Sequence, residues 1–220
     1  MSQMPILRGR YIGKTLYSSG IRIQQIAHES VLNTGPAQVI LLQHNHVYTL
    51  GRRGKHKDIL IGNDDLNALD LEIFETDRGG EVTYHGPGQL IVYPIVDLTE
   101  VKQGPIEFIR GLEKITISTL SDFGIHATSS NKPTGVWVDE AKIASIGIKV
   151  SNKITTHGLA ININTDLSYF DHIVSCGLSN LEHTSIAKET GKTHSIKKVA
   201  HHVANELSNM LGLSLQWDSN

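Results

Sequence analysis

The chain has 220 residues, which suits one large domain or at most two small ones and allows a sizeable buried core. Its 20 Lys and Arg residues nearly balance its 22 Asp and Glu residues, giving a formal net charge of −2, and the basic residues are scattered. This pattern excludes the concentrated positive charge typical of nucleic-acid-binding proteins. We expect one domain, residues 1–220, whose partners are a small molecule or a protein rather than nucleic acid.

Two further features bound the class of protein. No basic segment followed by an apolar one opens the chain, and no apolar run approaches the length of a bilayer span. We therefore expect a cytoplasmic protein that does not enter a membrane. The single cysteine, Cys176, excludes an intramolecular disulfide and a zinc cluster of several thiolates within one chain. A lone cysteine is more often buried and inert than reactive, so its neighbours must decide its role.

The first fifty residues predict a helix followed by strands. Apolar residues recur at helical spacing over residues 20–35, where a Gly–Pro pair ends the helix. The continuous apolar run at residues 39–42 is typical of a buried strand. Residues 47–50 predict a partner strand or an extension of the same strand.

The stretch from residue 78 to residue 89 is the most unusual in the chain. It holds four glycines and a proline together with arginine, threonine, tyrosine, histidine and glutamine side chains. Glycine adopts positive φ and lets a ligand approach the main chain, while the polar side chains supply charge and hydrogen bonds. A short helix beginning near residue 64 and a strand at residues 72–76 precede it, and the apolar run 91–96 follows. We interpret it as a binding loop between two strands.

The second half of the chain continues the mixed pattern. Pro105 marks the start of a helix that runs toward Gly124, and residues 135–138 and 142–150 predict a hairpin. A third strand over residues 155–164 places leucine and isoleucine on one face. Its other face carries small residues, which leave room for a ligand or serve tight packing equally well.

The last clear element is a helix after residue 195. Ser195 is placed to cap it, apolar residues form a stripe along it, and Gly212 closes it. Helices mixed with many strands joined by hairpins indicate an α/β domain of the α+β type, with one mixed sheet flanked by helices.

The twelve histidines raise the question of a metal site. Their spacing gives little support, because no His-Glu-x-x-His pattern occurs and scattered histidines usually lie on the surface or in hydrogen-bonded cores. We expect no metal. The candidate ligands, which a fold can bring together, are His44, His46, His56, His85 and His157.

Cys176 sits in a loop-like setting, with a glycine after it and polar residues shortly before it. A free cysteine with a pKa near ~8.5 is only a few per cent thiolate at neutral pH, so a reactive cysteine needs a positive group or a base beside it. Strand alternation does not choose among the candidates, which are Lys142, Lys149, His85 and His157.

Four blocks resemble the lipoyl(octanoyl) transferase family. Residues 78–89 resemble its arginine-glycine-glycine to glycine-proline-glycine-glutamine signature, and residues 135–147 resemble its lysine block. Residues 156–162 and the Cys176–Gly177 step complete the pattern in order. The resemblance spans most of the chain, and its first block is hard to match by chance. Ser175 departs from the family, in which proline commonly precedes the cysteine; this change could loosen the loop but removes no reactive group.

The resemblance implies an acyltransferase that works through a thioester. Cys176 would take an octanoyl or lipoyl group from acyl carrier protein and yield it to a lysine of a lipoyl domain, in protein lipoylation. By similarity, Lys142 would lower the thiol pKa and move protons. Thioester exchange is nearly isoenergetic and amide formation is downhill, so neither ATP, a metal nor another cofactor is required.

The resemblance also implies partners and substrate contacts. The partners would be octanoyl-acyl carrier protein, the lipoyl domains of 2-oxoacid dehydrogenase E2 subunits, and the glycine cleavage H protein. The oxyanion would take hydrogen bonds from backbone N–H groups near Cys176 and, as a hypothesis, from His85. The substrate contacts would be Arg78, Gly79, Gly80, Glu81, Val82, Thr83, Tyr84, His85, Ser145, Ile146, Gly147, Gly158, Leu159 and Ala160.

Two rival functions remain at this point. The family is similar in fold to lipoate-protein and biotin-protein ligases, which build a single domain on a mixed sheet flanked by helices. A ligase would activate a free acid with ATP and would not need Cys176. A non-catalytic domain that binds an acyl group or a carrier protein would take no covalent octanoyl group. The sequence leaves open the acyl chain length, the preferred acceptor and the oligomeric state.

Overall fold

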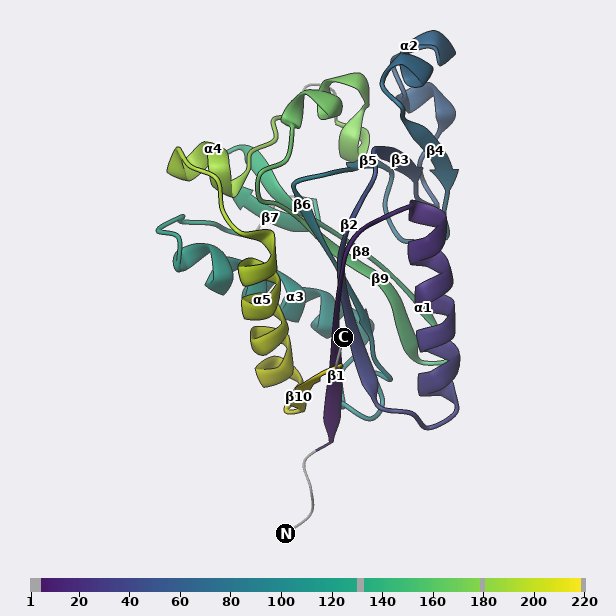
Figure 1. Cartoon of the computed structure of the whole chain (residues 1–220), viewed down its shortest axis with the longest axis vertical. Coiled ribbons are helices and arrows are strands. Elements are labelled where there is room, and N and C mark those ends of the chain that lie inside the picture. Colours follow the sequence, from purple (N-terminus) through teal and green to yellow (C-terminus); the bar gives the residue numbers. More distant parts are fainter. Residues whose placement is uncertain (1–4, 130–132, 179–180, 219–220) are drawn as a thin grey trace.

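The main sheet determines how the rest of the chain is arranged. The computed structural model describes residues 5–129, 133–178 and 181–218, without the side chain of Cys176. Within these residues a seven-stranded mixed sheet runs in the order β10-β1-β2-β6-β9-β8-β7 (Figure 1). The strands β10, β1 and β2 are parallel to one another, and the remaining neighbours are antiparallel. Their bounds are Ile6–Thr15 (β1), Ala37–His44 (β2), Gln89–Ile95 (β6), Gly135–Val138 (β7), Ala141–Ser151 (β8), Ile154–Asn162 (β9) and Ser214–Trp217 (β10).

Both faces of the sheet centre are covered, which explains the continuous apolar run of β2. Val39 and Leu41 point into one hydrophobic core, and Ile40 and Leu42 point into a second core on the opposite face. Because strand side chains alternate, a strand covered on both faces must be apolar at every position. The neighbouring β6 is buried along its whole length for the same reason.

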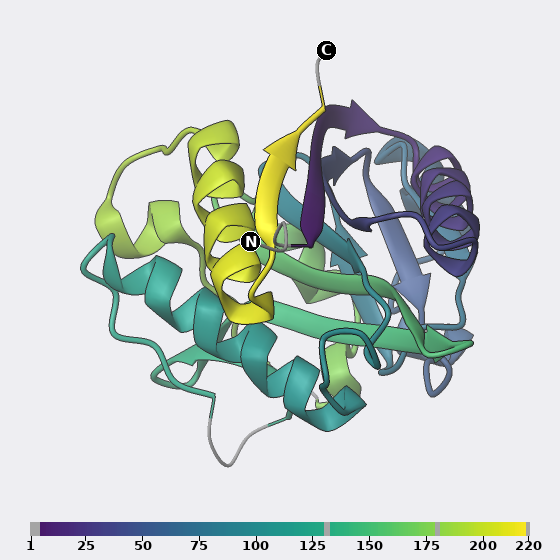
Figure 2. The same ribbon diagram turned by 90° about the horizontal axis from the view of Figure 1, so that it is seen from below.

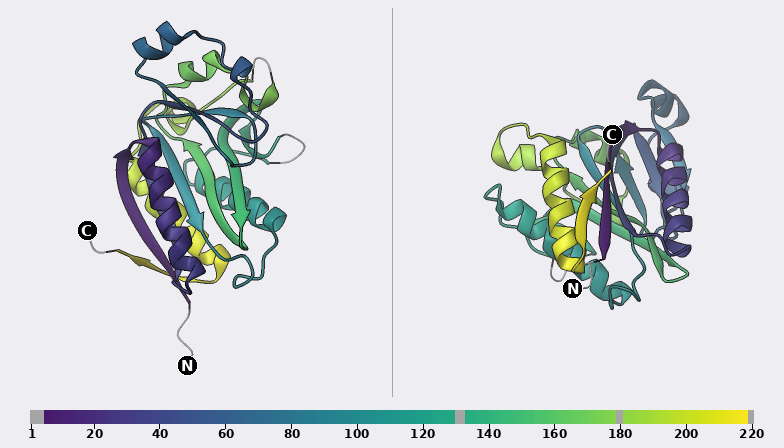
Figure 3. Two further views of the ribbon diagram at one scale, coloured as in Figure 1. Left: turned by 90° about the vertical axis from the view of Figure 1, so that its right-hand side faces the viewer. Right: turned by 60° about the horizontal axis from the view of Figure 1, so that its bottom comes forward.

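Helices cover the two faces. α1 (Tyr17–Leu32) packs on one face, and α3 (Pro105–Ser121) and α5 (Ile196–Leu211) pack together on the other (Figures 1 and 2). The view from the right-hand side shows α1 lying along the sheet (Figure 3). The predicted cap of α5 is confirmed, since the Ser195 side chain accepts the Lys198 N–H and Gly212 closes the helix at φ 65°.

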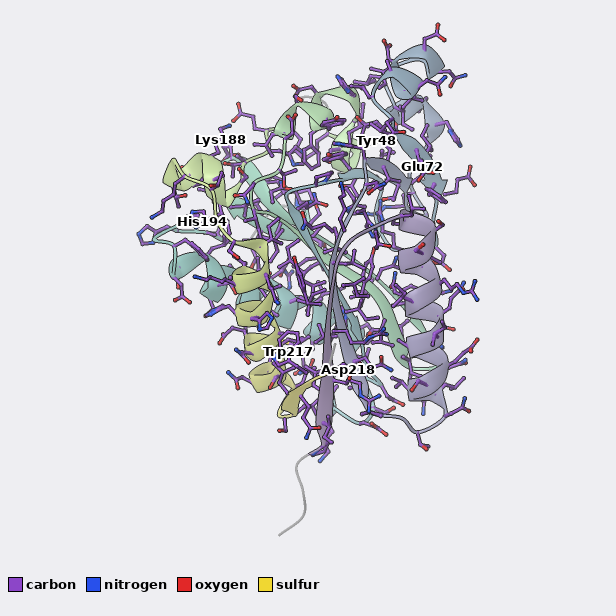
Figure 4. All side chains as sticks on the ribbon, viewed as in Figure 1. Tyr48, Glu72, Lys188, His194, Trp217 and Asp218 are labelled. Carbon is purple, nitrogen blue, oxygen red and sulfur yellow. The ribbon has the colours of Figure 1, made fainter. Side chains whose placement is uncertain are left out.

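A second, three-stranded sheet lies beyond one end of the large one. Its order is β4-β3-β5, built from β3 (Val47–Leu50), β4 (Glu72–Glu75) and β5 (Val82–His85). Tyr48 and Glu72 belong to this end of the molecule, whereas Trp217, at the end of β10, and the adjacent Asp218 lie well away from it (Figure 4). The short helices are η1 (His56–Asp58), α2 (Asn63–Ala68), η2 (Leu167–His172), η3 (Ser175–Gly177) and α4 (Ile186–Thr190).

The predicted fold class is confirmed, with three local corrections. Residues 47–50 neither extend β2 nor pair with it; they pair with β4 and β5 in the second sheet. The region predicted as one binding loop contains the strand β5. α1 starts and ends earlier than predicted; its earlier end reflects the turn at Thr34, whose φ is 64°.

Candidate active site

The predicted binding residues come together around one cavity of about 720 Å³. β5 and the loop before it, β8 and the middle of β9 supply its walls, and Lys142 lies in its lining. Of the predicted substrate contacts, all but Tyr84 line it: Arg78, Gly79, Gly80, Glu81, Val82, Thr83, His85, Ser145, Ile146, Gly147, Gly158, Leu159 and Ala160.

Tyr84 points away from the cavity. Its hydroxyl is hydrogen-bonded to His46 Nδ1 at 2.9 Å, and its ring stacks on Tyr169 with the centroids 4.8 Å apart. Alternation along β5 puts it on the face opposite Thr83 and His85, where it joins the small sheet to η2. Its position indicates a packing role.

Arg78 holds the loop together. Its side chain is buried, and its guanidinium donates to Thr49 O at 2.7 Å, to Glu81 O at 2.9 Å and to Gly79 O at 3.0 Å. Thr49 Oγ1 accepts a further hydrogen bond at 2.8 Å. The planar fork of arginine suits several acceptors at once. Arg78 therefore fixes the main chain of the cavity wall to β3.

Glycines allow backbone segments to meet at this wall. A Cβ atom at Gly147 would lie 2.7 Å from Gly79 O, and one at Gly51 would lie 2.4 Å from Gly80 O. Beside this contact, the Gly79 N–H donates to Ile148 O at 3.1 Å. Any side chain at position 51 or 147 would separate the loop from β3 or β8. Glycine at these two positions thus serves close packing of the backbone.

Asp77 links the loop to β8 and β9. Its Oδ1 accepts from His157 Nε2 at 2.9 Å, and its Oδ2 accepts from Lys149 Nζ at 2.7 Å. Burial alone would raise the pKa of Asp77, but hydrogen bonds from Lys149 and His157 bring that pKa below its usual value. Burial in turn lowers the pKa of His157. Sequence reasoning missed Asp77, whose only signal was its place directly before the loop.

Lys142 lies in the wall, with 2% of its surface exposed. Its Nζ sits 5.2 Å from the centre of the Trp137 ring, and a Cβ atom at Gly135 would lie 2.5 Å from its Cε. By contrast, the Lys149 side chain is 38% exposed and paired with Asp77. The structure thus separates the two lysines that strand alternation left equivalent, and gives Lys142 the enclosed position.

The Cys176 segment lies next to the same wall. The backbone of Cys176 belongs to η3, which contacts β5; its side chain lies outside the described part of the structure. The Val174 N–H donates to Asp58 O at 2.7 Å, and Gly177 adopts φ 68°. Ser175, the departure from the family pattern, is buried.

A chain of hydrogen bonds links His85 to the main chain of Lys142 through the side-chain amides of Gln89 and Asn162. His85 Nδ1 is 2.8 Å from Gln89 Oε1, and Gln89 Nε2 donates to Asn162 Oδ1 at 2.9 Å. Asn162 Nδ2 donates to Thr184 O at 3.0 Å, and the Thr184 N–H donates to Lys142 O, also at 3.0 Å. Sequence reasoning did not single out Gln89 or Asn162 for this role, although both are polar residues in strands that are otherwise largely apolar.

Other residues enlarge the wall beyond the sequence prediction. Tyr93 lines the cavity, and its hydroxyl meets His44 Nε2 at 2.8 Å. Its position as a tyrosine inside an apolar run is the sequence signal that marks it. The remaining unpredicted lining residues are Tyr17, Arg52, Arg53, Asp77, Ile91, Pro105, Ile109, Pro133, Thr134, Ile148, Lys149, Val150 and His157.

The five histidines considered as metal ligands do not form one group. His56 pairs with Glu75, His46 with Tyr84, and His157 with Asp77. Among the described residues, no group of three or more His, Cys, Asp or Glu side chains is arranged to hold a metal ion. In the described part of the chain, no helix combines the length and the apolar character needed to cross a membrane.

Buried histidines predict acid sensitivity. Burial, as the main cause, lowers the pKa of His44 to about 4 and the pKa values of His85 and His183 to about 3. Below the ordinary histidine pKa of ~6.5 the unfolded chain takes up protons at these positions before the folded chain does. The free energy of unfolding should therefore fall as pH decreases from about 6.5 to 4.5, each histidine contributing at most about 1.4 kcal/mol per pH unit.

Urea unfolding followed at several pH values measures this slope. His183→Gln should make the slope shallower, because the variant lacks one of the buried groups whose pKa differs between the two states. Replacing the partly exposed His201 gives the matched control, for which the wild-type slope is expected. Equal slopes for all three proteins would contradict the prediction.

Comparisons with known proteins agree with one another. The model of the family described as lipoyl protein ligase A/B catalytic domain matches residues 17–208. The octanoyltransferase of Solibacter usitatus is 48% identical over 171 residues, which cover 77% of this chain and 78% of that protein. The mitochondrial octanoyltransferase of Arabidopsis thaliana is 38% identical, covering 86% of this chain and 82% of that protein.

Solved structures share the fold at low sequence identity. Lipoate-protein ligase A bound with ATP has a TM-score of 0.72 at 15% identity, over 100% of this chain and 90% of that one. A lipoate protein ligase from an archaeal lipoylation system, studied with its E2 lipoyl domain from Thermoplasma acidophilum, has a TM-score of 0.72 at 14% identity, over 100% and 88%. Biotin protein ligase of Aquifex aeolicus with biotin and ATP gives 0.54 at 15% identity, over 94% and 70%. These likenesses support the fold alone.

Proposed function

The chain belongs to the lipoyl protein ligase A/B catalytic domain family, and we propose that it transfers octanoyl groups through a thioester on Cys176. Octanoyl transfer in protein lipoylation is the activity that its curated octanoyltransferase relatives support. One observation carries the proposed route. Lys142 is enclosed in the wall of the cavity, and β5, another part of that wall, contacts the segment that holds Cys176.

The first half-reaction needs a thiolate. The Cys176 sulfur attacks the carbonyl carbon of octanoyl-acyl carrier protein, a new C–S bond forms, and the bond to the carrier sulfur breaks. The carrier thiol leaves with a proton. A cation near the sulfur favours the thiolate, and Lys142, held in the wall beside Trp137, is the group that we propose for this role and for proton transfer.

The cavity wall suits an acyl chain. Apolar residues of four strands and of α3 line the space, so each methylene that leaves water contributes roughly 0.8 kcal/mol to binding. Backbone N–H groups near Cys176 and Gly177 are the proposed oxyanion donors. The apolar lining consists of Val82, Ile91, Ile109, Ile146, Ile148, Leu159 and Ala160.

The proposed partners follow from the family. We propose octanoyl-acyl carrier protein as donor and the lipoyl domains of E2 subunits and of the glycine cleavage H protein as acceptors. The archaeal ligase studied with its E2 lipoyl domain supports a lipoyl domain as acceptor. A cytoplasmic location also stays a proposal, since the Arabidopsis relative is mitochondrial.

An ATP-dependent ligase is the second candidate, since ligases with bound ATP share the fold. The two functions differ in their requirement for ATP. The protein should be mixed with octanoyl-acyl carrier protein without ATP, and its intact mass measured. One octanoyl group, released by hydroxylamine, is the expected adduct. Transfer from free octanoate that requires ATP, with no adduct from the carrier protein, would favour the ligase.

A further inference from the structure

Two backbone carbonyls fix the orientation of the amides beside His85. Tyr84 O and Thr184 O can only accept hydrogen bonds, so the nitrogen of Gln89 must face the first at 3.2 Å and the nitrogen of Asn162 must face the second at 3.0 Å. Asn162 Oδ1 is thereby left to accept from Gln89 Nε2. Neither amide can be reversed without placing two acceptors against each other.

The amide orientation sets the tautomer of His85. Gln89 Oε1, the atom that remains, meets His85 Nδ1 at 2.8 Å, so Nδ1 must carry the hydrogen. Burial, the largest cause, and the neighbouring His44 and Arg78 together lower the pKa of His85 to about 3. The ring is therefore neutral at physiological pH, and Nε2 carries a lone pair. This tautomer offers no N–H at Nε2, which argues against the hypothesis that His85 donates to the oxyanion.

The attacking amine is the reacting group that can donate a hydrogen bond to His85 Nε2. The octanoyl chain has no N–H or O–H, and the thioester carbonyl needs donors rather than acceptors. The attacking amine must bring its N–H bonds close to the thioester carbon. Both carboxylates in the lining are already paired, Glu81 with Arg53 at 2.8 Å and Asp77 with Lys149 and His157.

We propose that Gln89 and Asn162 lock His85 as the Nδ1–H tautomer, so that its Nε2 accepts a hydrogen bond from the attacking lysine amine. This inference rests on the proposed function and assigns a group to its second half-reaction. The amine nitrogen bonds to the acyl carbon, the C–S bond breaks, and the Cys176 sulfur leaves with the bonding electrons. The proton lost by the nitrogen ends on that sulfur, and the products are an amide and the free thiol. His85 holds the amine so that its lone pair faces the carbonyl.

The two half-reactions separate this role from a structural one. In His85→Asn the amide nitrogen replaces Nδ1 toward Gln89, but nothing replaces Nε2. Wild-type and variant acyl-enzymes are prepared with octanoyl-acyl carrier protein, desalted and mixed with a lipoyl domain in single turnover. The ratio of the transfer rate to the acylation rate should fall about tenfold or more. Gln89→Glu should give a similar fall, because a carboxylate favours the doubly protonated ring.

His201→Asn is the matched control, because His201 stacks on Trp217 and neither residue lines the cavity. It should keep the wild-type ratio. If His85→Asn slows acylation as much as transfer, or instead of transfer, Nε2 serves the carrier arm or the fold and the proposal is wrong. ¹⁵N NMR of histidine-labelled wild type gives an independent test: an unprotonated Nε2 is expected, and a protonated Nε2 would overturn the tautomer. Absence of any acyl-enzyme in wild type would instead overturn the proposed function.

Discussion

Cys176→Ser should lose the hydroxylamine-labile octanoyl adduct and transfer octanoyl to a lipoyl domain about a thousandfold or more slowly. A hydroxyl group is far less acidic than a thiol, so a nearby cation that favours a thiolate yields almost no alkoxide at neutral pH. Intact mass after mixing with octanoyl-acyl carrier protein reports the adduct, and single-turnover transfer reports the rate.

A matched variant in the same segment controls for damage to the fold. Leu178, two residues beyond the cysteine, is 43% exposed, and Leu178→Ala should keep the adduct. Undiminished transfer by Cys176→Ser would show that the acyl group does not pass through this sulfur. If that transfer also required ATP and accepted free octanoate, the chain would act as a ligase.

Lys142→Met should slow acyl-enzyme formation by about 10²- to 10⁴-fold, the usual range for loss of a proton-transfer group. Methionine preserves much of the buried stem beside Trp137 and Gly135 while removing the charge, so the fold should persist. Without the cation, the rate should rise with pH through about 8.5, the ordinary pKa of a free thiol.

The pH profile distinguishes this role from simple packing. Lys114 lies on the exposed side of α3, and Lys114→Met should leave both the rate and its pH dependence as in wild type. A Lys142→Met profile that is merely lowered, with its shape unchanged, would count against Lys142 as the group that favours the thiolate. The rate of acyl-enzyme formation, measured in quenched reactions at several pH values, gives this profile.

The elements predicted from sequence are those with strong local signals. α3 begins at a proline, α5 has a capping serine and a closing glycine, and the β7–β8 hairpin has two runs rich in valine and isoleucine around a polar turn. In β1, by contrast, charged residues and two glycines interrupt the pattern, and β10 is only four residues long. These two strands depend on pairing with each other across the length of the chain, which no short window can reveal.

Site residues that lie in a dense local motif could be predicted from the sequence. Site residues whose role depends on a distant partner could not. Residues 78–85 carry a dense local pattern, and the structure places all but Tyr84 in the cavity lining. The link from Asp77 to His157 joins residues 80 positions apart, and the link from Gln89 to Asn162 joins residues 73 positions apart. A polar residue in a strand has many possible partners, so its actual partner depends on strand order and register.

Arg78 has a consequence for the thermodynamics of substrate binding. A loop this rich in glycine would ordinarily lose much conformational entropy when a ligand orders it. Here the guanidinium fastens the main chain at Thr49, Gly79 and Glu81 through hydrogen bonds within the protein. The enthalpy and heat-capacity change of acyl-chain binding should therefore reflect burial of the chain alone, with little contribution from ordering of the protein.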